Sequence, residues 1–290
     1  MIYYTKKEMI MKKMTIAICY DFDKTLTTDD MQSFAFIPNL NMTTAEFWKK
    51  TNDFIKKNGC DVTLGFLRTM IDECRKKDIV LSREYLKEMG KSIPFAEGVL
   101  TWFKRLNTFA EKLGATLEHY IISSGNKEMI EGTKIFKEFT NVFACEYLYD
   151  KNGEAFWPKN AVNYTTKTQC LFRICKGAHD ISDEQTVNRR TEKKHVEFRN
   201  MIYIGDGVTD IPCMTLVKEK GGTAIAVYQA NKVQIGKELI ADGRVNYVCR
   251  NSYKSGSSLE KLLKTIIESL ILKEELLTKE NTHKKIANKK

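Results

Sequence analysis

The chain has 290 residues, of which 42% are hydrophobic and 10% aromatic, and its formal net charge is +10. This length allows one large domain or two modest ones with a sizeable core. No run of about 18 apolar residues occurs, which excludes a membrane-spanning helix. The basic residues 1–13 lack the apolar region of a secretory signal. Eight cysteines without any CxxC pair exclude a zinc ribbon and suggest reduced thiols, so we expect a cytoplasmic protein.

The positive charge is concentrated at the two ends of the chain and in one internal segment. Residues 1–13 and 279–290 are predicted to be basic, disordered termini, and residues 181–199 a loop or a solvated helix. A basic patch can bind nucleic acid, but no helix-turn-helix, RNP or zinc motif accompanies it here. We therefore expect neither a nucleic-acid partner nor a membrane partner, and the oligomeric state stays open.

The first part of the chain predicts one strand followed by a helical insertion. Residues 15–22 form a short apolar run with β-branched residues, which is typical of a strand buried on both faces. Helical patterns follow, and Thr43 with Glu46 resembles a capping box while Ser82 is a candidate N-cap. The predicted helices are 29–36, 43–57, 62–76 and 82–90.

From residue 93 onward, strand and helix patterns alternate. The predicted helices are 99–113, 128–139, 165–176 and 259–277, and a β-hairpin is expected over 147–156 around Asp150-Lys151-Asn152-Gly153. The predicted strands are 117–122, 142–145, 201–204, 223–227 and 245–248. This alternation predicts an α/β fold with a doubly wound parallel sheet. The core comprises residues 14–27 and 93–272, and residues 28–92 form an inserted small helical cap.

Three predicted strands end in polar residues. Asp21 and Asp23 follow the first strand, Ser123 and Ser124 follow the second, and Gly205-Asp206-Gly207-Val208-Thr209-Asp210 follows a later one. Because parallel strands end at one edge of the sheet, these side chains are predicted to converge there. An EF-hand is excluded, since Leu26 and Gln32 replace the glycine and the glutamate that its loop requires.

Several carboxylates at one edge favour a Mg²⁺ site, because hard cations take oxygen ligands. A divalent cation in turn favours a phosphate group as the substrate. An aspartate can attack phosphorus, and a second carboxylate two residues later can protonate the leaving oxygen and then activate water. A hydroxyl and a lysine would bind the remaining phosphoryl oxygens.

The motif Asp21-Phe22-Asp23-Lys24-Thr25, the residue Ser123, a lysine after the hairpin, and the Gly205–Asp210 motif together resemble the haloacid dehalogenase superfamily. Their order and spacing resemble its phosphoserine phosphatase branch over residues 14–250. The resemblance implies that Asp21 is the nucleophile and Asp23 the general acid/base. It implies Mg²⁺ ligation by Asp21, the Asp23 carbonyl and Asp206, with Asp210 supporting the metal or the lysine.

The same resemblance assigns the remaining site residues. Ser123 would bind phosphate, with Ser124 and Gly125 offering backbone N–H groups, although both serines can also cap the next helix. Lys167 matches the family's lysine, and Lys159 and Lys176 are competitors.

In the cap, Asp30 would pair with a substrate ammonium and Arg68 with a substrate carboxylate. The alternatives are that Asp30 is a neighbour of an N-cap and that Arg68 is a solvated helix residue. Trp48, Trp102 and Trp157 are expected to be packing residues, and Trp48 could also line a pocket.

The expected activity is that of a Mg²⁺-dependent phosphomonoesterase that forms an aspartyl-phosphate intermediate on a small phosphorylated metabolite, with phosphoserine-like molecules leading. Two alternatives stay open. A phosphotransferase would use the same intermediate, and a non-catalytic scaffold or nucleic-acid-binding protein would act through the basic segments. The scaffold alone has no need for the carboxylates at the sheet edge.

Overall fold

A computed structural model describes residues 14–191, 193–229 and 233–287 of the chain. Its centre is a seven-stranded sheet in the order β4-β3-β2-β1-β5-β6-β7, in which every neighbouring pair is parallel except the hairpin β3–β4. The strands are β1 (Met14–Tyr20), β2 (Ala115–Asn126), β3 (Asn141–Tyr149), β4 (Ala155–Asn160), β5 (Met201–Gly205), β6 (Thr223–Tyr228) and β7 (Tyr247–Arg250). The prediction of a doubly wound α/β fold is confirmed.

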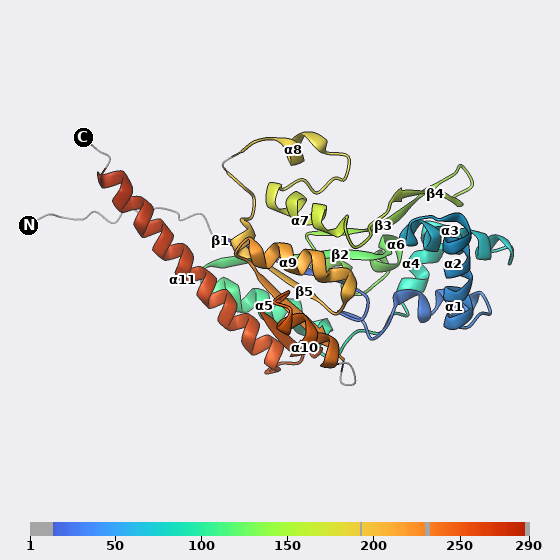
Figure 1. Ribbon diagram of the computed structural model, residues 1–290, viewed down its shortest axis with the longest axis horizontal. Helices are drawn as coiled ribbons and strands as arrows, with labels where there is room; N and C mark the ends of the chain where they lie inside the picture. The colour runs from blue at the N-terminus through green and yellow to red at the C-terminus, as the bar shows by residue number, and fades with distance from the viewer. Residues whose placement is uncertain (1–13, 192, 230–232, 288–290) are drawn as a thin grey trace, which may run out of the picture.

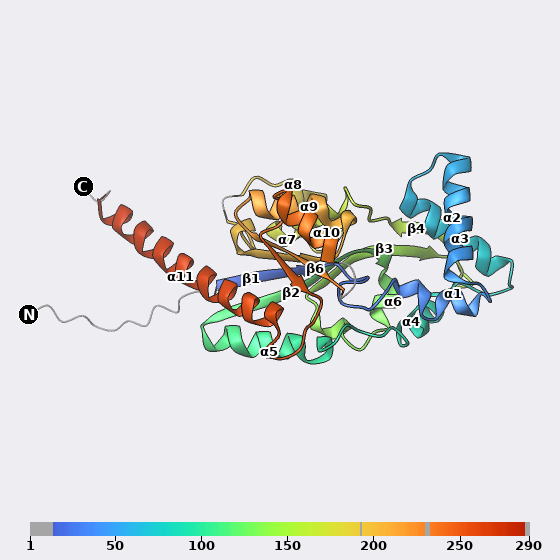
Figure 2. The ribbon, with the colours of Figure 1, turned by 60° about the horizontal axis from the view of Figure 1, so that its bottom comes forward.

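Helices cover both faces of this sheet (Figures 1 and 2). Alternate side chains of β1 explain the two layers, because Ile16 and Ile18 belong to one apolar cluster and Ala17 and Cys19 to the other. The first cluster includes α5 and α11, and the second includes α7, α9 and α10. These helices are α5 (Val99–Lys112), α7 (Lys167–Lys176), α9 (Ile211–Glu219), α10 (Val233–Ala241) and α11 (Ser258–Ala287).

The insertion between β1 and α5 is helical, as predicted, and lies beyond the end of the sheet at which the β3–β4 hairpin extends (Figure 1). Thr43 and Glu46 form the capping box that the sequence indicates, and the Ser82 hydroxyl accepts the backbone N–H of Tyr85. Residues 29–36 form only a 3₁₀ turn and the start of a short helix. The elements are η1 (Met31–Ser33), α1 (Phe36–Asn39), α2 (Thr44–Asn58), α3 (Val62–Arg75) and α4 (Arg83–Gly90).

Several predicted bounds differ from the structure. The helix expected over 128–139 ends early, as α6 (Lys127–Glu131), and a 3₁₀ turn, η2 (Phe136–Glu138), follows. Gly132 lies against the backbone of α4 there, and a Cβ atom on it would be 1.9 Å from the Lys87 carbonyl oxygen. The strand expected over 245–248 is shifted to Tyr247–Arg250. The helices α9 and α10 were not predicted.

The charged and terminal segments also take definite forms within the described residues. Residues 181–199 contain a five-residue helix, α8 (Glu184–Asn188), and lead into η3 (Phe198–Asn200) before β5. Helix α11 continues to Ala287, through most of the stretch expected to be disordered, and projects beyond the body of the molecule (Figure 1). Residues 1–13 and 288–290 lie outside the described residues. Of the predicted packing tryptophans, Trp102 is fully buried, whereas Trp157 is 64% exposed.

Candidate active site

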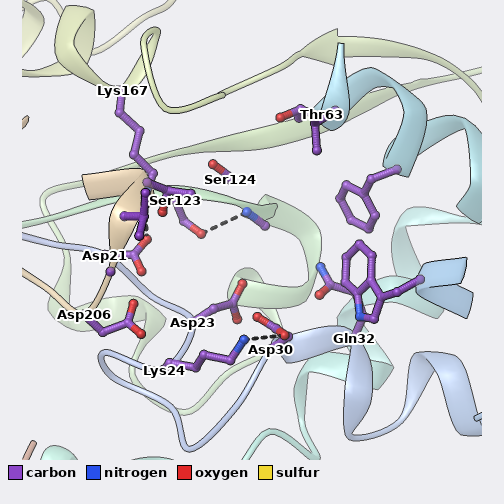
Figure 3. Close-up of a pocket in the computed structure, with 17 residues that line it drawn as sticks. Asp21, Asp23, Lys24, Asp30, Gln32, Thr63, Ser123, Ser124, Lys167 and Asp206 are labelled. Carbon is purple, nitrogen blue, oxygen red and sulfur yellow. Dashed lines mark hydrogen bonds and ion pairs between the residues drawn. The ribbon is translucent and has the colours of Figure 1, made fainter. Parts of the chain in front are cut away.

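The carboxyl ends of β1, β2 and β5 form the floor of a cavity of about 320 Å³. Asp21 follows β1 directly, and its backbone N–H donates to the Ile204 carbonyl of β5, which fixes the start of the loop. Ser123 and Ser124 come from β2, and Asp206 follows β5. The convergence predicted from the three strand ends is therefore present, and Figure 3 shows Asp21, Asp23 and Asp206 pointing into one space.

A buried lysine links the two acidic motifs. The ammonium of Lys167, at the start of α7, donates to Asp21 Oδ1 at 2.7 Å and to Asp210 Oδ1 at 2.8 Å. Burial acts to lower the pKa of Lys167, but the charges of Asp21 and Asp210 outweigh it and the pKa is raised. Lys167 is thus held as a cation beside the candidate nucleophile. The competing Lys159 pairs with Glu146 instead, and Lys176 donates to the Arg189 carbonyl.

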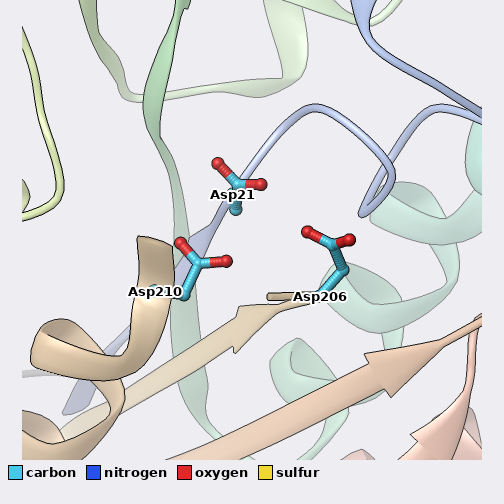
Figure 4. Close-up of side chains that lie close together, drawn as sticks. All are labelled: Asp21, Asp206 and Asp210. Atoms are coloured by element: carbon cyan, nitrogen blue, oxygen red, sulfur yellow. The ribbon is translucent and has the colours of Figure 1, made fainter. Parts of the chain in front are cut away.

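Three carboxylates lie close together around this lysine (Figure 4). Oxygens of Asp21, Asp206 and Asp210 all lie within 4.8 Å of one another. Burial first, and then the charges of the other carboxylates, raise the pKa of Asp21 to about 6 and that of Asp206 to about 8. Asp210 Oδ2 is buried and has no hydrogen-bond partner among the described residues. An all-oxygen set of this kind, short of positive charge, fits a hard divalent cation such as Mg²⁺.

Asp23 differs from Asp21 in its surroundings. Its Oδ1 accepts the backbone N–H of Met31 at 2.8 Å, which turns the carboxyl toward the cavity. Burial, followed by the charges of Asp21 and Asp30, raises its pKa well above the ordinary range. A raised pKa favours the protonated carboxyl, which is the form that can donate a proton. Asp23 is not a member of the group of three carboxylates; the ligand predicted from it is its main-chain carbonyl.

The segment Ser123-Ser124-Gly125 lines the side of the cavity opposite Asp206 (Figure 3). The Ser123 hydroxyl is buried and accepts the Gly125 N–H at 2.9 Å, so this N–H is already engaged. The Ser124 hydroxyl is buried without a partner within the described part of the chain. Gly125 has no room for a side chain, since a Cβ atom would lie 2.2 Å from Met31 Cε and 3.0 Å from Asp23 Oδ2.

The two cap residues proposed for substrate recognition are placed differently. Asp30 lines the cavity, but its Oδ2 accepts Lys24 Nζ at 2.6 Å. Arg68 does not line it; its guanidinium pairs with Asp72 one turn along α3 and its side chain is 55% exposed. Phe66 does line the cavity, and a residue two positions later points about 200° around the helix. The structure therefore does not bring Arg68 to the site.

Sequence reasoning missed several lining residues. Lys24 lies in the loop after Asp23, and the cap contributes Gln32, Val62, Thr63 and Phe66 in addition to Trp48. Lys24 is a non-glycine residue with φ = 57°, an uncommon conformation that often marks functional loops. The helical patterns do not indicate which face of α2 or α3 turns toward the sheet edge, so the sequence could not identify the lining residues of these two helices.

Comparisons with known proteins agree with this geometry. The model of the family described as "Putative Phosphatase" matches residues 16–266. A relative from Borreliella burgdorferi, described as "Uncharacterized protein", is 27% identical over 287 residues and covers 89% of this chain and 97% of its own. No helix of the described residues is long and apolar enough to cross a membrane.

The solved structures that resemble the chain share its fold at low sequence identity. A HAD family hydrolase from Salmonella enterica serovar Typhi is 16% identical with a TM-score of 0.55, over 81% of this chain and 67% of that one. A phosphoserine phosphatase in apo form is 18% identical with a TM-score of 0.54, over 86% and 98%. A phospho-aspartyl intermediate analogue of phosphoserine phosphatase is 18% identical with a TM-score of 0.52, over 87% of this chain and 99% of that one.

The family match covers most of the chain and includes the DxDxT and GDGxxD motifs at the sheet edge. The fold of the chain is that of the haloacid dehalogenase hydrolases. The chain therefore belongs to the family described as "Putative Phosphatase", and the fold expected from the resemblance to the haloacid dehalogenase superfamily is confirmed.

Proposed function

We propose that the protein is a Mg²⁺-dependent phosphomonoesterase that acts through a phosphorylated Asp21 on a small phosphorylated metabolite. The observation that carries the proposal is the buried arrangement of Lys167 between Asp21 and Asp210, with Asp206 close by. Burying two carboxylates against one lysine, with a third, half-buried carboxylate close by, is costly unless a further cation and an anionic substrate complete the site. A structural role alone gives no reason for that arrangement.

In the first step, an oxygen of Asp21 attacks the phosphorus of the substrate. The P–O bond to the leaving group breaks as the Asp21–phosphorus bond forms, and Asp23 supplies the proton that the leaving oxygen takes up. The raised pKa of Asp23 suits this role, because it favours the protonated carboxyl that the step requires. Lys167 Nζ, bound to Asp21 Oδ1, orients the nucleophile and offsets charge that develops on the phosphoryl oxygens.

In the second step, Asp23 now carries a negative charge and takes a proton from a water molecule. The oxygen of that water attacks phosphorus, the bond to Asp21 breaks, and phosphate leaves with the aspartate restored. The Ser123 and Ser124 hydroxyls offer donors to the phosphoryl oxygens during both steps. The structurally similar phosphoserine phosphatase described as a phospho-aspartyl intermediate analogue supports this scheme by analogy.

Asp21, Asp206 and the carbonyl of Asp23 would hold the metal, with Asp210 supporting either the metal or Lys167. A bound Mg²⁺ would neutralise phosphoryl charge and bring the phosphate group to the carboxylates. The insertion 28–92 would act as a cap that excludes water and contacts the leaving group. Because Arg68 pairs with Asp72 outside the cavity and Asp30 pairs with Lys24, we do not single out phosphoserine within this class of substrates.

The test is phosphate release from phosphorylated amino acids, sugars, nucleotides and aryl phosphates, with Mg²⁺ and with EDTA. We expect release that requires Mg²⁺ and that disappears in Asp21→Asn, while the variant keeps the native circular dichroism spectrum. Addition of acceptor alcohols distinguishes hydrolysis from phosphotransfer, because transfer would yield a new phosphate ester. Near wild-type release by Asp21→Asn would overturn the proposal.

A further inference from the structure

The cavity described above has two unlike halves. The half formed by the sheet edge carries the carboxylates, the two serines and Lys167. The opposite half is formed by the cap: Asp30 and Gln32 lie next to the sheet edge, and beyond them α2 and α3 contribute a mainly apolar surface (Figure 3). We call the group Trp48, Val62, Thr63 and Phe66 the cap wall. A substrate with its phosphate against Asp21 must direct its leaving group toward this wall.

The central part of the cap wall is aromatic. The rings of Trp48 and Phe66 lie 5.7 Å apart between centroids at an angle of 33°, and Phe47 packs edge-on against Trp48 at 5.4 Å. Phe66 and Thr63 are buried, whereas Trp48 is only half-buried and lines the cavity. The packing against two neighbours fixes the indole, so that it presents a preformed surface to a leaving group.

The charges near the cap wall are already compensated. Among the described residues that line the cavity, only Lys24 and Lys167 are cationic. Lys24 pairs with Asp30 at 2.6 Å and with Asp29 at 3.6 Å, and Lys167 is engaged by Asp21 and Asp210. No free cation is thus left among these residues to hold a carboxylate of the leaving group. Burial of an unpaired carboxylate against aromatic rings is unfavourable.

We propose that Trp48, supported by Phe66, is a specificity-determining residue that selects phosphate esters whose leaving group has a flat apolar face and disfavours leaving groups with a carboxylate. This inference rests on the proposed function and adds a substrate class to it. Aromatic stacking on the indole would orient such a group. Thr63 in the wall and Gln32 outside it offer polar atoms to the same space. Amino-acid phosphates would be poor substrates.

The test compares 1-naphthyl phosphate, O-phosphoserine and acetyl phosphate in Trp48→Ala, Trp48→Phe and Trp157→Ala. Trp157 is a matched control, because it is a tryptophan of β4 that is 64% exposed and does not line the cavity. For Trp48→Ala we expect kcat/KM for 1-naphthyl phosphate to fall about tenfold or more, mainly through KM, since stacking and apolar burial are both lost. Acetyl phosphate has too small a leaving group to contact the wall fully, so its loss should be several times smaller.

Trp48→Phe should recover most of the naphthyl activity, and Trp157→Ala should match the wild type with every substrate. A second variant tests the charge argument without disturbing packing: Val62 is 62% exposed, and Val62→Arg adds a cation to the cap wall. We expect this variant to raise the preference for O-phosphoserine over 1-naphthyl phosphate by about two- to fivefold, the range of an exposed ion pair.

Equal losses for naphthyl and acetyl phosphate in Trp48→Ala, or a wild-type preference for O-phosphoserine, would overturn the inference. Failure of the wild type to hydrolyse even acetyl phosphate in the presence of Mg²⁺ would instead contradict the proposed function. The two failures are therefore distinguishable.

Discussion

Replacement of Lys167 by methionine tests the electrostatics of the site most severely. Methionine keeps much of the volume of the lysine stem and removes its charge. The Lys167 side chain is 1% exposed, and its ammonium contacts Asp21 at 2.7 Å and Asp210 at 2.8 Å. The side chains of these two partners are 7% and 0% exposed. Removal of one partner from a buried ion pair costs about 3–5 kcal/mol, because it leaves an uncompensated buried charge. Here the change leaves two such carboxylates facing each other.

The assay is thermal and urea unfolding of Lys167→Met in EDTA. At about 2–4 °C per kcal/mol for a domain of this size, the melting temperature should fall by roughly 6–20 °C. The matched control is Lys159→Met, which removes the same charge from a side chain that is 44% exposed and whose partner, Glu146, keeps its ion pairs with Arg83 and Lys127. The free energy of unfolding should change there by no more than about 1 kcal/mol.

Two further measurements separate charge from packing. Mg²⁺ should restore part of the stability of Lys167→Met, because a cation bound to the native state replaces the missing charge. The double variant Lys167→Met/Asp210→Asn should be more stable than Lys167→Met alone, since it relieves the repulsion between the carboxylates. Equal unfolding free energies for Lys167→Met and Lys159→Met would refute the reasoning.

Other predictions concern single residues. Asp206→Asn should raise the Mg²⁺ concentration for half-maximal activity at least about tenfold, as measured by titration of phosphate release, because one anionic ligand is lost. Gly125→Ala should lower kcat/KM by about tenfold or more, because the added methyl group displaces Met31 and Asp23. A variant with the kcat/KM of the wild type would contradict the close approach of Gly125 to these two side chains. Burial lowers the pKa of His119 to about 3. In the unfolded state the histidine pKa is about 6.5, so the unfolded chain binds the proton more readily than the folded one. The free energy of unfolding therefore falls as the pH falls from about 6.5 toward 3, and His119 contributes about 1.4 kcal/mol of this loss per pH unit. Urea unfolding of His119→Gln at several pH values should show a shallower dependence, and an unchanged slope would contradict the neutral, buried histidine.

The sequence allowed the catalytic side of the cavity to be predicted in some detail. Each strand end that carries polar residues directly follows apolar strand residues, and parallel strands end at one edge of the sheet. The positions of Asp21, Ser123 and Asp206 follow from that rule. The prediction that Lys167 lies in the site depended on the order of the family's motifs, because no local pattern distinguishes it from Lys159 or Lys176.

The cap side could not be predicted to the same degree, for a geometric reason. Helix α3 was predicted almost to the residue, but its rotation about its own axis depends on how it packs against α2 and β4. That rotation turns Phe66 toward the cavity and Arg68 away from it. The ion pair of Lys24 with Asp30, six residues later, likewise depends on the conformation of the loop after Asp23.

Missed or shortened helices have local causes. Helix α9 begins with Pro212 in its first turn and is apolar over most of its length, so it lacks the polar–apolar periodicity of a surface helix. Helix α6 ends before Gly132, where the backbone of α4 lies too close for a side chain. Helix α11 is extended past the predicted end by helix-forming charged residues, among them the pair Glu280–Lys284.

The central claim is that Asp21 becomes covalently phosphorylated. The most direct measurement uses Asp23→Asn with p-nitrophenyl phosphate and Mg²⁺, because this leaving group needs no proton while the second step loses its base. After acid quenching, mass spectrometry of peptides should find a phosphoryl group on Asp21, and Asp21→Asn should show none. Release of p-nitrophenol without any adduct, or an adduct on another side chain, would contradict the account.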